Sequence, residues 1–464
     1  MATFNFAKKF AADKLVKKGL EYIEKDPEEN FLKILNLAEK LSNTKNQDRQ
    51  IEVIRENYKK NPVIKEFIRK LDDVAPSYKE GLLINFFVNS ALLGIPYQYK
   101  MADKLGHGVP WAILMDPTSA CNLNCEGCWA GEYDKSDTLE FETMDRIINE
   151  AKELGIYFII FSGGEPTVYP RLMELVERHP DVGFMMYTNG TLIDDEMADK
   201  MLELGNITPA ISLEGYKEQT DARRGEGVFD KIMAAMDRLR ERGIIFGVSL
   251  TAHRNNVYDL FQGEDFYDFL IEKGATYGWL FHYMPIGRDP DLDMMLTPEQ
   301  RGFLAERVNE LRSNKPLFLI DFWNDGTYAG GCIAGGRRYF HINAKGDVEP
   351  CAFAHFATDN IKDKSLKEVL DNPLFREYQK RQPFNENSLR PCPIIDNNPA
   401  LREIVKESGA EPTHAGAGNV ITEEVGKKLE DLAERWEKVS RPIHEKRVSK
   451  KEKEKEKKKE KVKS

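Results

Sequence analysis

The 464-residue sequence contains no secretory signal at its N-terminus and no apolar run long enough to be a clear bilayer span. The longest uncharged stretch of its N-terminal part, residues 81–97, is short for a span and includes Asn and Ser. Only six cysteines occur, which excludes a disulfide scaffold and indicates reduced thiols in the cytoplasm. The sequence also lacks an excess of basic residues over most of its length: residues 441–464 carry a formal charge of +7, and residues 1–440 carry −17. No nucleic-acid partner is therefore expected.

The N-terminal section, residues 1–107, is predicted to be helical. Apolar residues recur there at three- and four-residue steps, as at Phe31, Leu35 and Ala38. The first 18 residues mix five Lys with three Phe, a pattern that suits an anionic membrane surface as well as an ordinary solvated helix. The stretch at 81–97 is predicted to be a buried helix, with an interfacial or substrate-access helix as the alternative. Peripheral contact with the inner face of the membrane is therefore compatible with a cytoplasmic protein.

Residues 108–320 repeat a strand-then-helix unit. Helical patterns at 141–154, 197–204 and 229–239 are each followed by Gly, the residue that commonly ends a helix. Alternating units of this kind predict an α/β fold with a parallel sheet, open or curled into a barrel, and with function at the carboxyl ends of the strands. The six strands are expected at 111–115, 156–161, 183–187, 207–213, 244–250 and 277–283.

The C-terminal part divides into two sections. Residues 321–400 are rich in Gly, Pro and Cys and have weak periodicity. Residues 401–464 contain one helical pattern at 425–439, which follows Thr422 as a candidate cap. The Lys- and Glu-rich tail after it is predicted to be disordered.

Cys121, Cys125 and Cys128 form the strongest motif, a C-x3-C-x2-C loop directly after the first predicted strand. Three thiolates on a short loop can converge on a metal ion or on an iron–sulfur cluster. A structural zinc site normally has four ligands, and the sequence nearby offers no fourth Cys or His. Three protein ligands to a four-iron cluster would instead leave one iron open to another molecule.

This loop resembles the signature of radical S-adenosylmethionine (radical SAM) enzymes, and similar motifs follow on successive predicted strands. Gly163-Gly164-Glu165-Pro166, after the second strand, is similar to the family motif that holds the methionine amino group. Asn189, after the third strand, matches a segment near the nucleoside. The resemblance covers roughly residues 108–390 and implies the family's six-stranded partial (β/α) barrel.

Two further matches concern the methionine carboxylate. Ser212 to Gly215 end the fourth strand where many members have S-x-D-G, so that Glu214 stands in the place of Asp. Residues 220–225 (TDARRG) look like the family's H-D-x-x-R-G, which implies that Arg224 clamps the carboxylate with Ser212 as a supporting donor. One position departs from the pattern: Gly127 precedes the third cysteine where an aromatic residue usually sits by the adenine. Trp129 is the candidate substitute, and a backbone contact alone is the alternative.

The resemblance implies a [4Fe–4S] cluster and S-adenosylmethionine as cofactors. Its open iron would be chelated by the methionine part, and an electron from the cluster would cleave the cofactor to methionine and a 5′-deoxyadenosyl radical. That radical abstracts hydrogen from an unactivated C–H bond. A low-potential donor such as ferredoxin or flavodoxin is the expected partner. A non-catalytic iron–sulfur carrier or sensor is the alternative of another class, although it would have no need for methionine-binding groups.

Cys332, Cys351 and Cys392 make up the second set. The spacing from Cys332 through Gly346 to Cys351 resembles the opening of SPASM or twitch extensions, which hold auxiliary iron–sulfur clusters. A complete SPASM extension has seven or more cysteines, so the resemblance implies one further cluster at most. Such a cluster would have an open iron or a non-cysteine ligand such as His355. Two alternatives are a zinc site of these three cysteines with His355, and inert buried thiols.

The substrate is the least determined feature. The motif order is similar to that of bacterial radical SAM proteins proposed to join lipid acyl tails, and the basic-aromatic N-terminus and the +7 tail are compatible with work at a membrane surface. We therefore expect carbon–carbon coupling of lipid acyl chains. Members with this type of extension mostly modify peptides and proteins, so a peptide-modifying maturase is the alternative.

Overall fold

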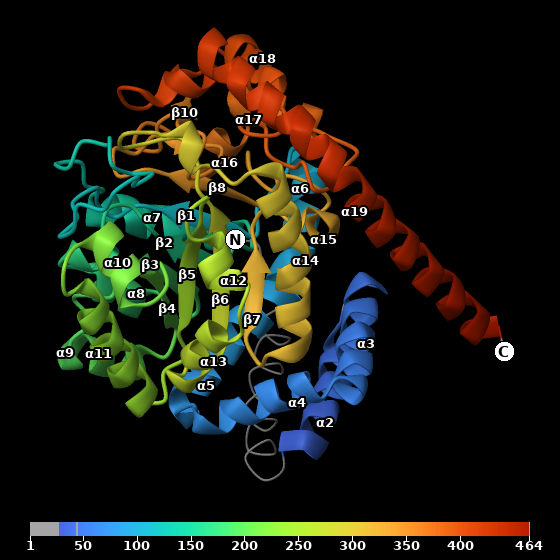
Figure 1. Cartoon of the computed structure of the whole chain (residues 1–464). Helices are drawn as coiled ribbons and strands as arrows, with labels where there is room; N and C mark the ends of the chain where they lie inside the picture. The colour runs from blue at the N-terminus through green and yellow to red at the C-terminus, as the bar shows by residue number, and fades with distance from the viewer. Residues whose placement is uncertain (1–26, 43–44, 464) are drawn as a thin grey trace.

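The computed structural model describes residues 27–42 and 45–463, and a parallel sheet lies at its centre (Figure 1). The six predicted strands are all present and stand side by side in chain order. In the register of the parallel strands, Ile113 of the first strand lies opposite Ile159 of the second, and Met185 of the third lies opposite Thr208 of the fourth. The strands are β1 (Ala112–Met115), β2 (Phe158–Phe161), β3 (Gly183–Thr188), β4 (Ile207–Leu213), β5 (Gly247–Ala252) and β6 (Tyr277–His282).

The sheet is wider than the sequence predicts. β7 (Phe318–Asp321) extends it in parallel beyond β6, and β8 (Tyr339–Ile342) pairs in parallel with β1 at the other side. The two-residue β9 (Val348–Glu349) then pairs antiparallel with β8. The C-terminal extension therefore shares one sheet with the barrel. These strands are so short that their residues have no readable period, and only the long-range pairing defines them.

Helices cover the outer face of the sheet, and several of them, such as α7 (Phe141–Glu153) and α11 (Val228–Glu241), bury an apolar stripe. Gly155, Gly205 and Gly243 follow three of these helices with positive φ, as the sequence predicts. The helices are α7 (Phe141–Glu153), α8 (Leu172–Arg178), α9 (Asp195–Leu204), α10 (Lys217–Arg224), α11 (Val228–Glu241), α12 (Val257–Phe261), α13 (Asp265–Glu272) and α14 (Pro298–Asn314), with short 3-10 turns at η3 (Pro166–Val168) and η4 (Leu292–Met294).

The N-terminal section is helical, and its second half packs under the amino ends of the strands. The amides of Asn85 and Asn89 donate to the backbone carbonyls of Pro180 and Asp181 just before β3. The stretch at 81–97 is therefore a helical segment against the barrel, and no helix within the described residues is long and apolar enough to span a bilayer. The basic-aromatic segment at 1–18 lies outside the described residues. The elements are α2 (Pro27–Leu41), α3 (Lys45–Lys60), α4 (Pro62–Arg69), η1 (Lys70–Asp73), α5 (Pro76–Leu82), the π-helix η2 (Leu83–Gly94) and α6 (Ile95–Leu105).

The C-terminal part ends in one long helix rather than in a disordered tail. α19 (Glu423–Lys463) packs on α14 and then leaves the body of the molecule (Figure 1). The predicted helix at 425–439 is its first half, and the Lys- and Glu-rich tail continues it, because both residues have high helix propensity. The remaining elements are α15 (Gly326–Ala329), α16 (Leu366–Leu370), α17 (Pro373–Arg381), α18 (Asn398–Ser408), η5 (Ala417–Ile421) and the two-stranded pair of β10 (Phe356–Ala357) with β11 (Glu411–Pro412).

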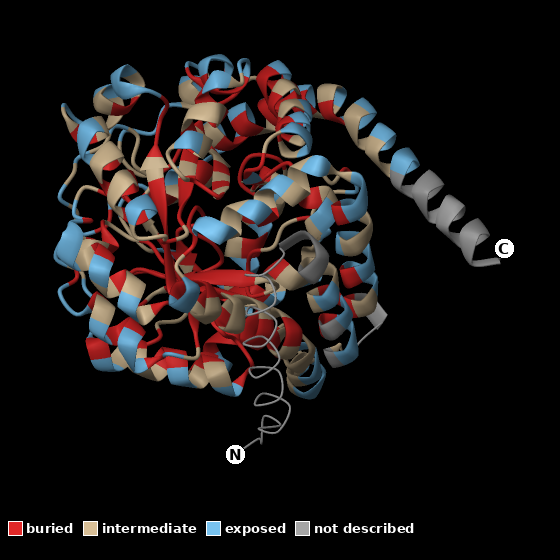
Figure 2. Ribbon diagram, turned by 90° about the horizontal axis from the view of Figure 1, so that it is seen from below, coloured by how far each residue is buried: buried red, intermediate tan, exposed pale blue. Residues whose placement is uncertain are grey.

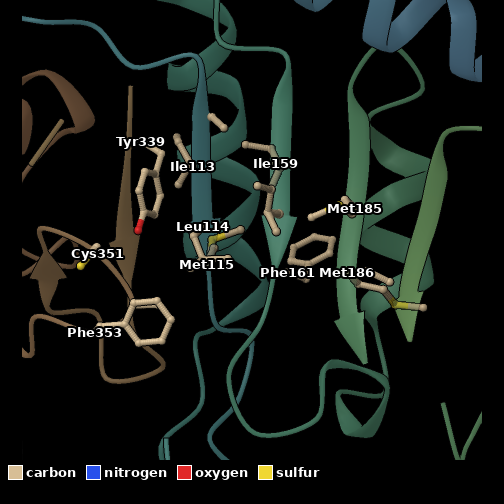
Figure 3. Close-up of a cluster of buried hydrophobic side chains, with 14 of the residues drawn as sticks. Ile113, Leu114, Met115, Ile159, Phe161, Met185, Met186, Tyr339, Cys351 and Phe353 are labelled. Atoms are coloured by element: carbon tan, nitrogen blue, oxygen red, sulfur yellow. The ribbon is translucent and has the colours of Figure 1, made fainter. Parts of the chain in front are cut away.

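The hydrophobic core is continuous from the barrel into the extension (Figure 2). It joins the apolar residues of β1 to β6 with those of β8 and α17. The close-up in Figure 3 shows Tyr339 and Phe353 of the extension beside β1, which carries Leu114 and Met115, and Cys351 further from that strand. Side chains of the extension thus form part of the barrel wall.

Candidate active site

The three cysteines of the loop after β1 line one cavity of about 200 Å³, which we call the cysteine-loop cavity. All three are half-buried free thiols. Burial raises the pKa of Cys121 and of Cys125, although Arg224 and Arg223 act to lower that of Cys125. Among the predicted cofactor contacts, Pro166 and Glu214 stand behind the wall, and the following line the cavity: Gly163, Gly164, Glu165, Asn189, Ser212, Arg224 and Trp129.

The GGEP turn is joined to the cysteine loop by its backbone. The Gly164 N–H donates to the Thr118 carbonyl (3.0 Å), and the Glu165 N–H donates to the Ala120 carbonyl (2.8 Å). A Cβ at Gly164 would run into the Ala120 carbonyl, and Gly163 has φ +110°, so both positions need glycine. The motif therefore holds the loop in position from the neighbouring strand.

Glu165 is buried, and four donors fix its carboxylate. Oε1 accepts hydrogen bonds from the Thr167 N–H (3.2 Å), the Thr167 hydroxyl (2.6 Å) and the Thr188 hydroxyl (2.6 Å). Oε2 accepts one, from the Asn189 N–H (2.7 Å), which leaves it room for a further donor. Burial raises the pKa of Glu165, and these hydrogen bonds oppose the rise. A cationic amine in the cavity would satisfy the remaining lone pair.

Two arginines share the buried Glu214 carboxylate. Oε1 lies 2.6 Å from Nη1 of Arg223 and 2.5 Å from Nη2 of Arg224. Burial alone would raise the pKa of Glu214, but the two guanidiniums outweigh it and lower the pKa. Arg224 also lines the cavity, so Glu214 orients the guanidinium that the resemblance assigns to the methionine carboxylate.

Arg223, to which the sequence analysis assigns no role, is tied to the cysteine loop. Its guanidinium donates to the carbonyls of Glu126 (3.1 Å) and Gly127 (3.5 Å), and its own carbonyl accepts from the Glu126 N–H (3.0 Å). Both arginines stand side by side in the TDARRG motif. Both line the cavity, but consecutive positions on a helix point about 100° apart, so only Arg223 also reaches the loop carbonyls.

Asn189 and Ser212 occupy the other wall. The Asn189 amide donates to Oδ1 of Asn122 on the cysteine loop (2.8 Å), and its own Oδ1 accepts from Thr191 (2.9 Å from N, 2.6 Å from Oγ1). Ser212, at the end of β4, is half-buried in the same wall. Asn189 thus fixes the loop rather than standing free in the cavity.

Tyr283 takes the space beside Gly127. Gly127 has φ +60°, and a Cβ there would lie 3.0 Å from Cε2 of Tyr283, which also lines the cavity. Trp129 turns toward the extension, with ring centroids 5.8 Å from His341 and 6.1 Å from Phe353. Tyr283 is therefore a second aromatic ring in the cavity that could contact the adenine in place of Trp129.

His282 is a further residue of the cavity wall. It ends β6, is 3% exposed and stacks on Trp323 with ring centroids 4.9 Å apart. Neither ring nitrogen has a hydrogen-bond partner within the described structure. Burial, and next Arg301, lower the pKa of His282 well below its usual value, so the ring is neutral and able to donate or accept.

A buried charge network joins the barrel to the extension behind this wall. His341 on β8 lies 2.9 Å from Asp116 at the end of β1 and 2.6 Å from Glu349 on β9. Tyr133 and Thr413 donate to the same Glu349 carboxylate. Burial opposes a charge on the ring, but the two carboxylates outweigh it and raise the pKa of His341 to about 10. The imidazolium therefore holds the loop and extension together.

The second cysteine set lines a larger cavity of about 880 Å³, which we call the barrel cavity. It extends from Cys332, Cys351 and Cys392 through the lower barrel to the N-terminal helices at Leu82 and Phe86. Burial raises the pKa of all three thiols, that of Cys351 to about 12. The two cavities have common wall residues, namely Trp111, Trp279, Phe322, Ile333, Tyr339 and Phe353.

Both ring nitrogens of His355, the candidate non-cysteine ligand, are hydrogen-bonded to other groups. Its Nε2 donates to the Ala352 carbonyl (2.8 Å), and its Nδ1 forms a hydrogen bond with Nε2 of His414 (2.6 Å). In addition, no three His, Cys, Asp or Glu side chains within the described ranges are arranged to hold one metal ion. The described residues thus contain no preformed zinc site, and the zinc alternative stays a prediction. Both nitrogens of His355 are instead used to attach the segment that carries His414.

The residues of the cysteine-loop cavity fit the implied cofactors. A four-iron cluster is larger than one metal ion and is held by three thiolates that lie further apart. The cavity offers three free thiols on one loop, a carboxylate oxygen of Glu165 with a spare lone pair, and the guanidinium of Arg224. These are complementary to the amino and carboxylate groups of an amino acid.

Comparisons with known proteins agree with this geometry. Residues 115–259 match the model of the radical SAM superfamily, and residues 332–393 match the SPASM model, described as an iron–sulfur cluster-binding domain. The chain is 31% identical to the mycofactocin maturase MftC of Mycobacterium tuberculosis over 311 residues, which cover 63% of this chain and 78% of that protein. It is 28% identical to the PqqA peptide cyclase of Granulibacter bethesdensis, covering 58% and 76% of the two chains.

The chain is also similar to a relative with a different activity and to a solved structure. The chain is 31% identical to the Fe-coproporphyrin III synthase of Methanosarcina barkeri over 229 residues, which cover 47% of this chain and 57% of that protein. Among solved structures, SuiB of Streptococcus suis bound to the precursor peptide SuiA has a TM-score of 0.53 at 18% identity, covering 65% and 75% of the two chains. This structural likeness extends to the fold alone.

Proposed function

The chain belongs to the radical SAM superfamily with a SPASM extension, and on that premise we propose that it is an enzyme that modifies a peptide or protein at an unactivated C–H bond. Its cofactors are a [4Fe–4S] cluster and S-adenosylmethionine, and the SPASM extension implies further iron–sulfur chemistry. Membership in a family of enzymes argues against the non-catalytic carrier or sensor that the sequence left open. The observation that carries the peptide proposal is the match over 78% of a maturase and 76% of a peptide cyclase.

The residues of the cysteine-loop cavity have separate tasks under this proposal. Cys121, Cys125 and Cys128 hold the cluster, Glu165 accepts from the methionine amino group, and Arg224 pairs with its carboxylate. When bound, the reduced cluster supplies the electron that cleaves S-adenosylmethionine and so produces the radical that takes hydrogen from the substrate. Arg223 keeps the loop in place, because it donates to two of the loop carbonyls.

Side chains around the cavity exclude water from the reaction. Tyr283 and Met284 are buried just after β6. Phe353 stands at the junction of the two cavities, and Phe281 of the cysteine-loop cavity packs against it. A dry, apolar wall protects a radical from side reactions, and it strengthens the charged contacts with the cofactor. A substrate carbon at this junction would lie within a largely aromatic surface.

A second candidate function, the coupling of lipid acyl chains, rests on the barrel cavity. Its volume of about 880 Å³ is near the upper end of the ~300–1,000 Å³ typical of ligand pockets. Most of the lining side chains are aliphatic or aromatic, so a peptide backbone there would leave polar groups unpaired, whereas an acyl chain would not. At one side of the lining, Phe318 and Tyr328 are 60% and 71% exposed. The comparisons support the peptide candidate better than the lipid one.

One experiment separates the candidates. Anaerobically reconstituted protein is given dithionite and S-adenosylmethionine with either a synthetic peptide library or phosphatidylglycerol liposomes, and 5′-deoxyadenosine is measured. The peptide proposal expects stimulation by the library, with products that have lost hydrogen by mass spectrometry. Stimulation by liposomes alone would replace it with the lipid candidate. The Cys125→Ala variant gives the background in both arms.

The barrel cavity offers a matched control for the same assay. Met185 is buried and lines this cavity, so Met185→Trp fills it while Met185→Leu conserves volume. The lipid candidate expects lipid-dependent turnover to fall at least tenfold in Met185→Trp and to be kept in Met185→Leu. Equal turnover in both variants would mean that the substrate does not use the barrel cavity.

A further inference from the structure

Lys79 is a buried lysine of α5 whose charge has no partner in the structure. Its side chain is 4% exposed and lines the barrel cavity. Within residues 27–42 and 45–463, no hydrogen bond or ion pair joins its ammonium group to another side chain or to a carbonyl. Lysine is rarely buried unless it is paired, because an unpaired charge loses its hydration without compensation. An anionic ligand for Lys79 is therefore expected.

Arg301 shows how the chain satisfies a buried cation by itself. It is as deeply buried as Lys79, and its Nη1 lies 2.8 Å from Oδ1 of Asp396. The same guanidinium lies over the ring of Trp436, 4.4 Å from the centroid. Among the described residues, Lys79 has neither kind of contact, so its burial is not explained by the packing of the chain.

The two carboxylates that line the barrel cavity are already engaged. Asp325 pairs with Arg312 through both of its oxygens (2.7 and 2.5 Å). Asp321 accepts three hydrogen bonds from the segment that follows it, including one from the Asn324 amide (2.8 Å). Neither carboxylate forms an ion pair with the lysine. The described part of the cavity wall therefore contains a cation without a counter-charge.

Lys79 lies at the end of the barrel cavity that is remote from the cysteines. Its neighbour Tyr78 donates to the carbonyls of Ile207 and Ile245, at the amino ends of β4 and β5. The cavity extends from there to Cys332, Cys351 and the wall that it shares with the cysteine-loop cavity. β6 has six residues and rises about 20 Å at ~3.3 Å per residue. One acyl chain spans a similar length, about half of the ~30 Å core of a bilayer.

The lining between the two ends is mostly apolar. Leu82 and Phe86 of the N-terminal helices and Met185 of β3 belong to it. The hydroxyls of Thr208 and Thr276 also line the cavity, but they donate to carbonyls of the barrel backbone (2.8 and 3.0 Å). An aliphatic chain fits such a wall without leaving polar groups unpaired. Only its end at the lysine needs a charged group.

We propose that Lys79 binds the anionic head group, a carboxylate or a phosphate, of a long-chain amphiphile whose aliphatic tail lies in the barrel cavity. The ammonium selects an anionic head over a neutral one and sets the direction of the chain. The tail then points from the amino ends of the strands toward the junction with the cysteine-loop cavity. The inference rests on the second candidate function, because it names the part of the lipid that the chain recognises.

The test measures binding to the anaerobically reconstituted full chain without reductant, so that no turnover occurs. Hexadecanoate, hexadecyl phosphate and neutral hexadecanol share one tail and are compared by equilibrium dialysis below their micelle concentrations. We expect at least one of the two anions to bind at least tenfold more tightly than the alcohol. Lys79→Met should remove this preference and keep the affinity for hexadecanol. Met185→Trp, which fills the cavity, should weaken the binding of all three probes.

Arg338→Gln is the matched control, because Arg338 also lines the barrel cavity but already donates to the hydroxyl of Tyr99 (3.1 Å). It should keep the preference for anions. Loss of the preference in Arg338→Gln and not in Lys79→Met would overturn the proposal, as would equal affinity of the parent for the three probes. The tighter of the two anions assigns the head group as a carboxylate or as a phosphate.

Thermal unfolding gives an independent measurement. Lys79→Met should be at least as stable as the parent, because it replaces an unpaired buried ammonium with an apolar side chain. A lower melting temperature would mean that the ammonium already has a partner in the chain, and it would overturn the proposal. Since binding is measured without reductant, a failure of lipid to stimulate 5′-deoxyadenosine formation would count against the second candidate function and not against this site.

Discussion

The two cysteine sets lie in environments of opposite character. The loop of Cys121, Cys125 and Cys128 is half-buried, and ion pairs and hydrogen-bonded carboxylates surround it. Cys332, Cys351 and Cys392 line a mostly apolar cavity, and burial raises the pKa of each. A polar wall suits a cofactor that binds, reacts and leaves, whereas an apolar wall suits a group that stays and passes electrons. We therefore expect the first set to serve a cofactor that exchanges and the second set to serve a group that is retained.

Removal of one cysteine from each set is the strongest test of this comparison. Cys125→Ala should reduce 5′-deoxyadenosine formation to background, because the loop loses one of its three proposed ligands. Cys351→Ala should keep S-adenosylmethionine cleavage but lose substrate turnover. Chromatography of 5′-deoxyadenosine together with iron content gives both quantities. Equal loss of cleavage in the two variants would mean that the sets are not separate in function.

The two arginines of α10 allow the polar wall itself to be divided. Arg224→Gln should weaken S-adenosylmethionine binding at least tenfold, since it removes the guanidinium that the resemblance assigns to the methionine carboxylate and leaves Arg223 tied to the loop. Arg223→Gln should mainly lower iron retention, because it frees the carbonyls of Glu126 and Gly127. Calorimetric binding and iron content after gel filtration measure the two effects. Identical profiles for the two variants would show that the pair acts only as a counter-charge to Glu214.

The order of barrel strands and the position of the cofactor motifs could be predicted because both depend on local patterns. Runs of β-branched and aromatic residues defined β1 to β6, and glycine after each of three helices marked its end. The close approach of the GGEP turn to the cysteine loop requires glycine at position 164, and this requirement makes the motif recognisable in the sequence. These features require only neighbours within one βα unit.

The parts that sequence could not provide depend on long-range pairing and on side-chain direction. β8 contains four residues, and its pairing with β1 brings together positions more than 200 residues apart. The sequence does not distinguish Arg223 from Arg224, because the orientation of α10 determines which of the two contacts the cysteine loop. His355 matched a ligand pattern, yet His414 and the Ala352 carbonyl occupy its nitrogens.

The charge network between the two regions predicts a pH dependence of stability. The pKa of His341 is raised to about 10, against about 6.5 in an unfolded chain, so its contribution is complete below pH 6.5 and is lost as the pH rises through 10. For one proton the slope is at most about 1.4 kcal/mol per pH unit. Urea unfolding between pH 7 and 10 should show this decline in the parent and a smaller one in His341→Gln. The same slope in both proteins would mean that His341 does not stabilise the contact between the barrel and the extension.

The smallest expected effect concerns the turn at Gly127, where the polar loop meets the aromatic wall. Gly127→Ala places a Cβ 3.0 Å from Cε2 of Tyr283 and forces alanine into φ +60°, at a cost of about 1–2 kcal/mol for the backbone. Combination with Tyr283→Leu should relieve the contact but not the backbone strain. A double-mutant cycle on S-adenosylmethionine affinity therefore divides the two costs. Full recovery in the double variant would mean that Tyr283, and not the loop backbone, determines why glycine stands where an aromatic residue is usual. Partial recovery would mean that the backbone conformation of the turn itself requires glycine, independently of the contact with Tyr283.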